Sequence, residues 1–223
     1  MSQPPVIAID GPAASGKTTV GRRLAARLGY RFLDTGLMYR AVAWAALAEG
    51  IDLEEAGALS ALARRRRLRV AFGSGDEARI WVDGREVTPL LADAGVEEAV
   101  SPVARVAGVR KALVAQQRRI AREGPIVMAG RDIGTVVVPG ARLKVFLTAS
   151  EEERARRRVA ELKDMGRAAG YSRVLEELER RDRMDSTRAV SPLRPAPDAQ
   201  IIATDGKTVD DVVELILSLW EPR

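Results

Sequence analysis

The chain has 223 residues, of which 46% are hydrophobic and 30% charged, a composition typical of a globular protein with one sizeable core. It contains no Cys and no His, which excludes disulfides, thiolate nucleophiles, histidine general bases and His- or Cys-based metal sites. A net charge of +5 and a pI of about 9.9 fit either a nucleic-acid-binding protein or an enzyme that handles several phosphates.

Short apolar runs alternate with helical patterns along most of the chain. We expect a strand in PPVIAID, a helix over Lys17–Leu28, a strand in YRFLD and a helix over LMYRAVAWAALAEG that Gly50 ends. Three further strands are expected at Gly124–Gly130, Leu143–Ala149 and Ala199–Asp205. Continuous apolar strands that alternate with helices predict an α/β fold with a parallel sheet covered on both faces.

Two stretches depart from this alternation. Residues 68–90 have no helical period and carry two turn signals, GSGD and Asp83-Gly84, which predict a small antiparallel sheet inserted in the α/β chain. Residues 151–188 are helical and crowded with Arg, and the proline-stiffened segment SPLRPAPDA connects them to the last strand.

The strongest motif is GPAASGKT, which lies between the first strand and the first helix. Its glycines allow backbone N–H groups to surround phosphate oxygens, and the following helix points its positive end at the same anion. Lys17 can reach the β- and γ-phosphates of a nucleoside triphosphate, and the Thr18 hydroxyl can bind Mg²⁺. The expected nucleotide-binding residues are Gly11, Pro12, Ala13, Ala14, Ser15, Gly16, Lys17, Thr18 and Thr19.

Two classes of phosphate-loop protein fit the sequence poorly. Regulatory GTPases usually recognise guanine with an Asn-Lys-x-Asp segment, and this chain contains no Asn. Motor and transport ATPases need a strand that ends in an acidic pair, whereas VMAGRD supplies Asp132 alone. A small-molecule kinase fits best.

Polar residues suited to a phosphate acceptor follow two of the expected strands. LDTGLMYR places Thr35, Tyr39 and Arg40 at a helix start, and GRDIGTVV places Arg131 and Asp132 after the strand that ends at Gly130. The carboxyl ends of parallel strands line the ligand crevice in such sheets. A hydroxyl, a phenol and two guanidinium groups there suit a phosphate monoester.

The helical stretch carries two further sets of candidates. RRDRMDSTR spaces Arg181, Asp185 and Arg188 along one helix stripe, which could equally be a surface ion-pair ladder. EEERARRR spaces Arg154, Arg157 and Arg158 at i, i+3 and i+4 on one helix face, as in mobile lids that exclude water from a γ-phosphate.

GPAASGKTT, LDTGLMYR, AGRDIGTVV and RDRMDSTRAVSPL, in this order, resemble the bacterial cytidylate kinases over nearly the whole chain. The resemblance implies a P-loop NTPase-type core with a five-stranded parallel sheet, a monophosphate-binding domain with a small antiparallel β insert, and a helical lid. The implied boundaries are 1–34, 123–150 and 189–223 for the core, 35–122 for the monophosphate-binding domain with its insert at about 68–90, and 151–188 for the Arg-rich lid and an adjoining helix.

The implied reaction converts ATP and CMP or dCMP to ADP and CDP or dCDP, with Mg²⁺. By this resemblance Thr35, Tyr39, Arg40 and Arg131 surround the acceptor phosphate, and Asp185 binds the ribose beside Arg181 and Arg188. Ser101, Arg110 and Asp132 would read the cytosine edge. Lys17, Arg131, Arg157 and Arg158 would be the catalytic residues.

Two alternatives stay open at this point. One is a different nucleoside-monophosphate kinase, with UMP or AMP as its acceptor. The other is a basic nucleic-acid-binding protein that uses ATP as a switch, although aromatic residues for base stacking are only 4% of the chain. The sequence shows no signal-peptide pattern and no membrane-spanning run, so we expect a cytoplasmic monomer without nucleic-acid or membrane partners.

Overall fold

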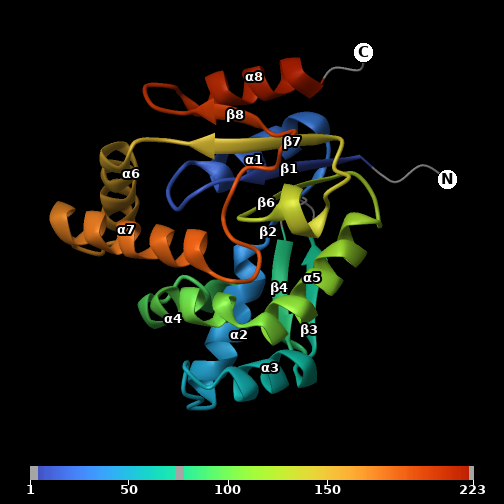
Figure 1. Ribbon diagram of the computed structural model, residues 1–223, viewed down its shortest axis with the longest axis vertical. Coiled ribbons are helices and arrows are strands. Elements are labelled where there is room, and N and C mark those ends of the chain that lie inside the picture. The colour runs from blue at the N-terminus through green and yellow to red at the C-terminus, as the bar shows by residue number, and fades with distance from the viewer. Residues whose placement is uncertain (1–4, 74–77, 221–223) are drawn as a thin grey trace.

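The computed structural model describes residues 5–73 and 78–220. Its centre is a five-stranded sheet in the order β2-β6-β1-β7-β8, with every neighbouring pair parallel (Figure 1). The strands are β1 (Val6–Asp10), β2 (Arg31–Asp34), β6 (Ile126–Gly130), β7 (Leu143–Thr148) and β8 (Gln200–Ala203). The predicted parallel α/β sheet is therefore confirmed, and each predicted strand overlaps an observed one.

Helices cover both faces of this sheet because side chains alternate along each strand. On one face, Ile7 and Ile9 pack with α1 (Lys17–Leu28) and α8 (Val209–Trp220). On the other face, Val6 and Ala8 belong to the core built with the helices that follow β2. Those helices are α2 (Gly36–Ala48), α3 (Ala56–Arg65), α4 (Ala94–Arg105) and α5 (Ala107–Ala121).

The inserted antiparallel sheet is also confirmed. It consists of β3 (Leu68–Phe72), β4 (Ala78–Val82) and β5 (Arg85–Glu86), followed by the short helix η1 (Thr88–Leu90). The turn at Asp83-Gly84 has positive φ at both residues, 49° and 86°, as a two-residue hairpin turn of this kind requires. The other predicted turn, GSGD, falls largely on residues 74–77, outside the described residues.

The Arg-rich segment 151–188, in which a helical lid and an adjoining helix are expected, forms two helices. They are α6 (Glu151–Asp164), which Ser150 caps, and α7 (Tyr171–Thr187). The chain leaves α6 through Gly166, whose φ of 71° is left-handed and ends the helical path. The structure differs from the expected alternation of strands and helices between β6 and β7, where the connection contains a single π-helical turn, η2 (Ile133–Val137), in place of a full helix.

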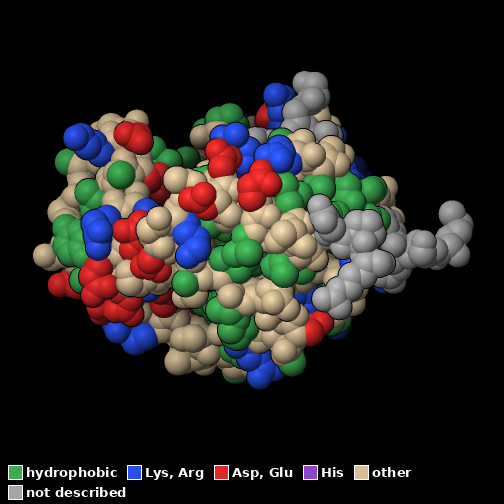
Figure 2. All heavy atoms as spheres, turned by 90° about the horizontal axis from the view of Figure 1, so that it is seen from above, with side chains coloured by type: hydrophobic (Ala, Val, Ile, Leu, Met, Phe, Trp, Pro, Cys, Tyr) green, Lys and Arg blue, Asp and Glu red, His purple; other side chains and the backbone are tan. Residues whose placement is uncertain are grey.

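The carboxyl ends of the parallel strands meet at one edge of the sheet, beside the lid helices (Figure 1). Figure 2 views the molecule from the side of α8, and on this face basic and acidic side chains of the described residues are interspersed. Within the described part of the chain, no helix combines the length and apolar character needed to cross a membrane.

Candidate active site

A cavity of about 580 Å³ lies at the carboxyl edge of the sheet. Its walls come from the loop after β1, the start of α2, helices α4 and α5, the turn after β6, both lid helices and the segment after β8. Of the site residues expected from the sequence, all except Gly11 and Pro12 line this cavity. The structure thus brings together motifs that are far apart along the chain, as expected for a site built from the carboxyl ends of parallel strands.

The loop after β1 adopts the conformation that its glycines permit. Gly16 immediately precedes α1 with a φ of 90°. A Cβ atom at Gly11 would lie 2.1 Å from the carbonyl oxygen of Leu147, so no larger residue fits there without a shift of the backbone. Gly11 therefore has a packing role beneath the loop, which explains why it does not line the cavity although it belongs to the motif.

Lys17 starts α1 and is buried, with 7% of its surface exposed. Its Nζ donates hydrogen bonds to the carbonyl of Pro12 and to the hydroxyl of Ser15. Burial, and next the nearby guanidinium of Arg131, hold the pKa of Lys17 well below its ordinary value. The same two causes lower the pKa of Arg181 to about 10. The cations are crowded at this point, and a bound polyphosphate would stabilise all three of them.

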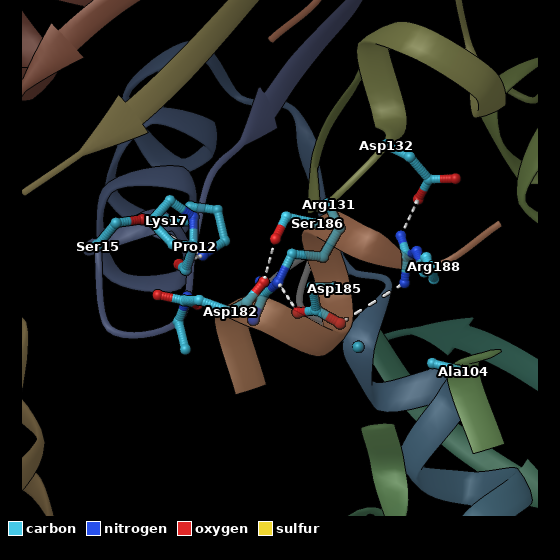
Figure 3. Close-up of polar contacts among 12 residues, drawn as sticks. Pro12, Ser15, Lys17, Ala104, Arg131, Asp132, Asp182, Asp185, Ser186 and Arg188 are labelled. Atoms are coloured by element: carbon cyan, nitrogen blue, oxygen red, sulfur yellow. Dashed lines mark hydrogen bonds and ion pairs between the residues drawn. The ribbon is translucent and has the colours of Figure 1, made fainter. Parts of the chain in front are cut away.

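One part of the cavity contains a network of buried ion pairs (Figure 3). Arg131 donates a 2.8 Å hydrogen bond from Nε to Asp185. Arg188 lies between two carboxylates, 3.7 Å from Asp185 and 3.9 Å from Asp132. Arg110 completes the network by pairing with Asp132. The side chains of these five residues are 3–19% exposed, so the predicted stripe on α7 is part of a buried site and not a surface ladder.

Tyr39 packs beside this network. The guanidinium carbon of Arg110 lies 5.3 Å from the centre of the Tyr39 ring. Burial raises the pKa of Tyr39 to about 12, so the phenol stays protonated at neutral pH. Its hydroxyl has no hydrogen-bond partner among the described residues, nor do single nitrogens of Arg110, Arg181 and Arg188. Unpaired buried polar atoms are costly, and four of the seven found among the described residues belong to side chains that line this cavity, where a polar ligand would complete them.

The remaining acceptor candidates are held by two helices, α2 and α4. Thr35, at the start of α2, donates a 2.9 Å hydrogen bond to the carbonyl of Ala129 in β6, which leaves its oxygen lone pairs free to accept. Arg40 donates to the carbonyl of Leu91 at 3.2 Å. Ser101 reaches the cavity from α4 and is 7% exposed.

The two lid arginines point to different parts of the cavity. Arg157 donates to the carbonyl and the hydroxyl of Thr204, both at 2.8 Å, and so faces the end of β8. Arg158 pairs with Glu161 in its own helix and with Glu97 on α4. Neighbouring residues of one helix thus approach the site from opposite sides.

Several lining residues are absent from the sequence prediction. They are Asp34, Glu97, Glu153, Glu161, Thr204, Lys207 and Thr208, with apolar neighbours. Asp34 and Thr204 could have been predicted as site residues from the sequence, because each lies at the carboxyl end of a predicted strand. Glu97 had none, since it lies in an acidic first turn that is ordinary for a helix.

Asp34 adds a carboxylate to the metal site that the sequence predicts at Thr18. Its carboxylate accepts a 2.7 Å hydrogen bond from the Thr18 hydroxyl, beside the phosphate-binding loop. Among the described residues no group of three His, Cys, Asp or Glu side chains could hold a metal ion by itself. Two adjacent oxygen donors next to a phosphate site nevertheless fit Mg²⁺, which binds through few protein ligands and completes its shell with phosphate oxygens and water.

The chain matches the family model described as "Cytidylate kinase" over residues 7–221. It is 47% identical over 98% of its length to a cytidylate kinase of Pelotomaculum thermopropionicum, of which it covers 96%. A cytidylate kinase of Bacillus licheniformis is 42% identical over 97% of the chain and is covered to 96%. A solved structure of an uncharacterised protein from Eubacterium ventriosum has a TM-score of 0.53 at 13% identity, with 98% of this chain and 99% of that one covered, which shows the fold alone.

Some relatives are longer. A bifunctional pantoate ligase/cytidylate kinase of a Synechococcus species is 49% identical over 97% of this chain, which spans 40% of that relative's length. The matches to proteins of both kinds cover nearly the whole of this chain. The chain belongs to the cytidylate kinase family.

Proposed function

We propose that this protein transfers the γ-phosphate of ATP to CMP or dCMP, giving ADP and CDP or dCDP. The observation that carries the proposal is one cavity in which a phosphate-binding loop faces the buried ion-pair network of Arg131, Asp185, Arg188, Asp132 and Arg110. A triphosphate on the loop and a monophosphate on the network would face each other across that cavity. Family membership and the names of the relatives support the same assignment.

In the proposed reaction an oxygen of the acceptor phosphate forms a bond to the γ-phosphorus. The bond from that phosphorus to the β–γ bridging oxygen breaks, and ADP leaves with its electron pair. The acceptor oxygen is already a nucleophile, so a chain without His or Cys has no need of a strong base. Lys17, Arg131, Arg157 and Arg158 would neutralise the charge on the phosphates and align the two nucleotides.

Thr18 and Asp34 would hold Mg²⁺ through their oxygens, with Asp34 acting directly or through water. When bound, the ion neutralises charge on the β- and γ-phosphates. The protein's own contribution is to fix the hydroxyl and the carboxylate beside the loop before the nucleotide arrives.

The acceptor base would be read by three buried groups. Cytosine presents an amino donor beside two acceptors, and Asp132 can accept from the amino group while Arg110 and Ser101 donate to the acceptors. Uracil places a carbonyl where cytosine has the amino group, which would leave the Asp132 carboxylate facing an oxygen. Pairing of a buried carboxylate therefore favours cytosine over uracil.

Asp185 would bind the sugar hydroxyls, and Arg131, Arg181 and Arg40 would bind the acceptor phosphate beside Thr35 and Tyr39. We propose that the core (1–34, 123–150, 189–223), the monophosphate-binding domain (35–122) and the Arg-rich lid move as three parts. Because closure around two nucleotides requires no second subunit, we propose a monomer, active in the cytoplasm where both nucleotides are available.

Titration of CMP into the wild type and into Asp185→Ala tests the acceptor assignment. Loss of a buried charged hydrogen-bonding group costs about 1.5–3 kcal/mol, so the dissociation constant of CMP should rise roughly tenfold or more. Glu177→Ala, on the exposed side of the same helix, is the control and should bind CMP normally. Equal CMP affinity in Asp185→Ala and the wild type would show that the α7 stripe is structural.

A further inference from the structure

Glu97 is an acidic side chain in a cavity otherwise suited to phosphates. It lies on α4, which packs beside α7 in Figure 1, and its carboxylate pairs with Arg158 of α6. Arg167, in the segment between the two lid helices, approaches the same carboxylate at 3.4 Å. The Glu97 and Arg158 side chains are each 16% exposed, so water screens this pair less than a surface pair.

Two further cations act on the same carboxylate. Burial raises the pKa of Glu97, but Arg158, Arg40 and Arg181 outweigh burial and hold the pKa below its ordinary value. Glu97 is therefore ionised at neutral pH. Arg158 and Arg167 contact its carboxylate, and Arg40 and Arg181, which line the same cavity, attract it electrostatically. A carboxylate surrounded by arginines has the same charge complementarity as a bound phosphate oxygen.

Three of the four arginines that act on Glu97 are groups that the proposed function gives to nucleotide phosphates. Arg40 and Arg181 face the acceptor phosphate in that assignment, and Arg158 belongs to the lid. We propose that Glu97 is a positioning residue that substitutes for a phosphate. In the ligand-free protein it holds Arg158 on the acceptor side, and a nucleotide phosphate must displace it to engage that arginine. This inference rests on the proposed function.

The consequence is a competition that lowers apparent affinity. If a ligand binds only to molecules in which Arg158 is free of Glu97, its apparent affinity is reduced in proportion to the fraction of such molecules. Removal of the Glu97 charge should therefore tighten the binding of phosphate-bearing ligands and leave phosphate-free ligands unaffected. Since ground state and transition state gain equally, KM for CMP should fall while kcat stays the same.

Glu97→Gln keeps the size of the side chain and removes its charge. We expect the dissociation constant of CMP to fall about three- to tenfold, while that of cytidine, which lacks the phosphate, stays unchanged. Glu98→Gln is the matched control, because Glu98 is the next residue of α4, is exposed and does not line the cavity. It should leave both affinities at their wild-type values.

Glu97→Asp keeps the charge but shortens its reach, and should give a CMP affinity between those of the wild type and Glu97→Gln. If Glu97→Gln does not fold, this variant carries the test, and a wild-type CMP affinity in it would overturn the inference. An unchanged or weaker CMP affinity in folded Glu97→Gln would also overturn it. Failure of the wild type to bind CMP at all would instead contradict the proposed function.

Discussion

The arginines of the active site differ from most other arginines of the chain in their burial. The side chains of Arg110 and Arg188 are each 3% exposed, whereas that of Arg173 is 75% exposed. A buried guanidinium requires a partner, and Asp132 and Asp185 supply the carboxylates. Exposed pairs elsewhere contribute little to stability, so the functional arginines are identified by where they are buried and not by their number.

Lys17→Met should lower kcat by roughly 100-fold or more, because it removes a positive charge from the γ-phosphate in a site shielded from water. The fold should survive, since burial already disfavours the charged form of this lysine and Met fills a similar volume. Steady-state kinetics and thermal unfolding check both statements. Lys111→Met, at an exposed position on α5, is the control. Near-normal turnover in Lys17→Met would exclude the loop as the donor site.

At the scale of elements, Asp10 joins two parts of the site. It ends β1, and its two carboxylate oxygens each accept a 2.8 Å hydrogen bond, one from the N–H of Ile133 and one from that of Gly134. The strand that leads into the phosphate loop is thereby fixed to η2, which follows Arg131 and Asp132. Burial outweighs these hydrogen bonds and raises the pKa of Asp10 to about 6.

This raised pKa predicts a pH-dependent stability. The ordinary pKa is 3.8, so between pH 3.8 and about 6 the folded protein holds a proton that the unfolded chain has lost. The stabilisation is complete below pH 3.8 and is lost as pH rises through 6. Asp10→Asn cannot titrate, so relative to this variant the wild type should lose about 3 kcal/mol of unfolding free energy across that window. Denaturant unfolding of both proteins measures the difference, and a pH-independent difference would contradict the assignment.

The elements that a short apolar run or a turn signal defines could be predicted from the sequence, and so could the phosphate loop. The turn η2 could not, because Thr135 and the three valines after it favour a strand. A lid and an adjoining helix are expected in residues 151–188, but the residues that separate them are not, although Gly166 and Gly170 mark that break. Glu97 escaped notice for another reason, since its partner Arg158 is 61 positions away and only the fold brings them together.

At the scale of the whole molecule, helix α6 contacts the phosphate loop near its N-terminus and helix α4 one turn later. Arg154 donates to the carbonyl of Ala13 in the phosphate loop at 3.4 Å and pairs with Asp182 of α7. Arg158, one helical turn later, reaches Glu97 on the other side of the cavity. The phosphate loop, α6 and α4 are thus already linked by these contacts. In the proposed reaction, closure of the lid would exchange the ion pair between Arg158 and Glu97 for a pair with a phosphate.

The central claim is that CMP or dCMP accepts the γ-phosphate of ATP, and a coupled ADP-release assay tests it most directly. Mg·ATP would be supplied with CMP, dCMP, UMP, AMP and GMP in turn. We predict rapid ADP formation with CMP and dCMP and little with AMP or GMP, because Asp132 and Arg110 are placed to pair with a cytosine edge. ADP release that needs no monophosphate would contradict the account, since the buried acceptor network would then have no substrate to bind.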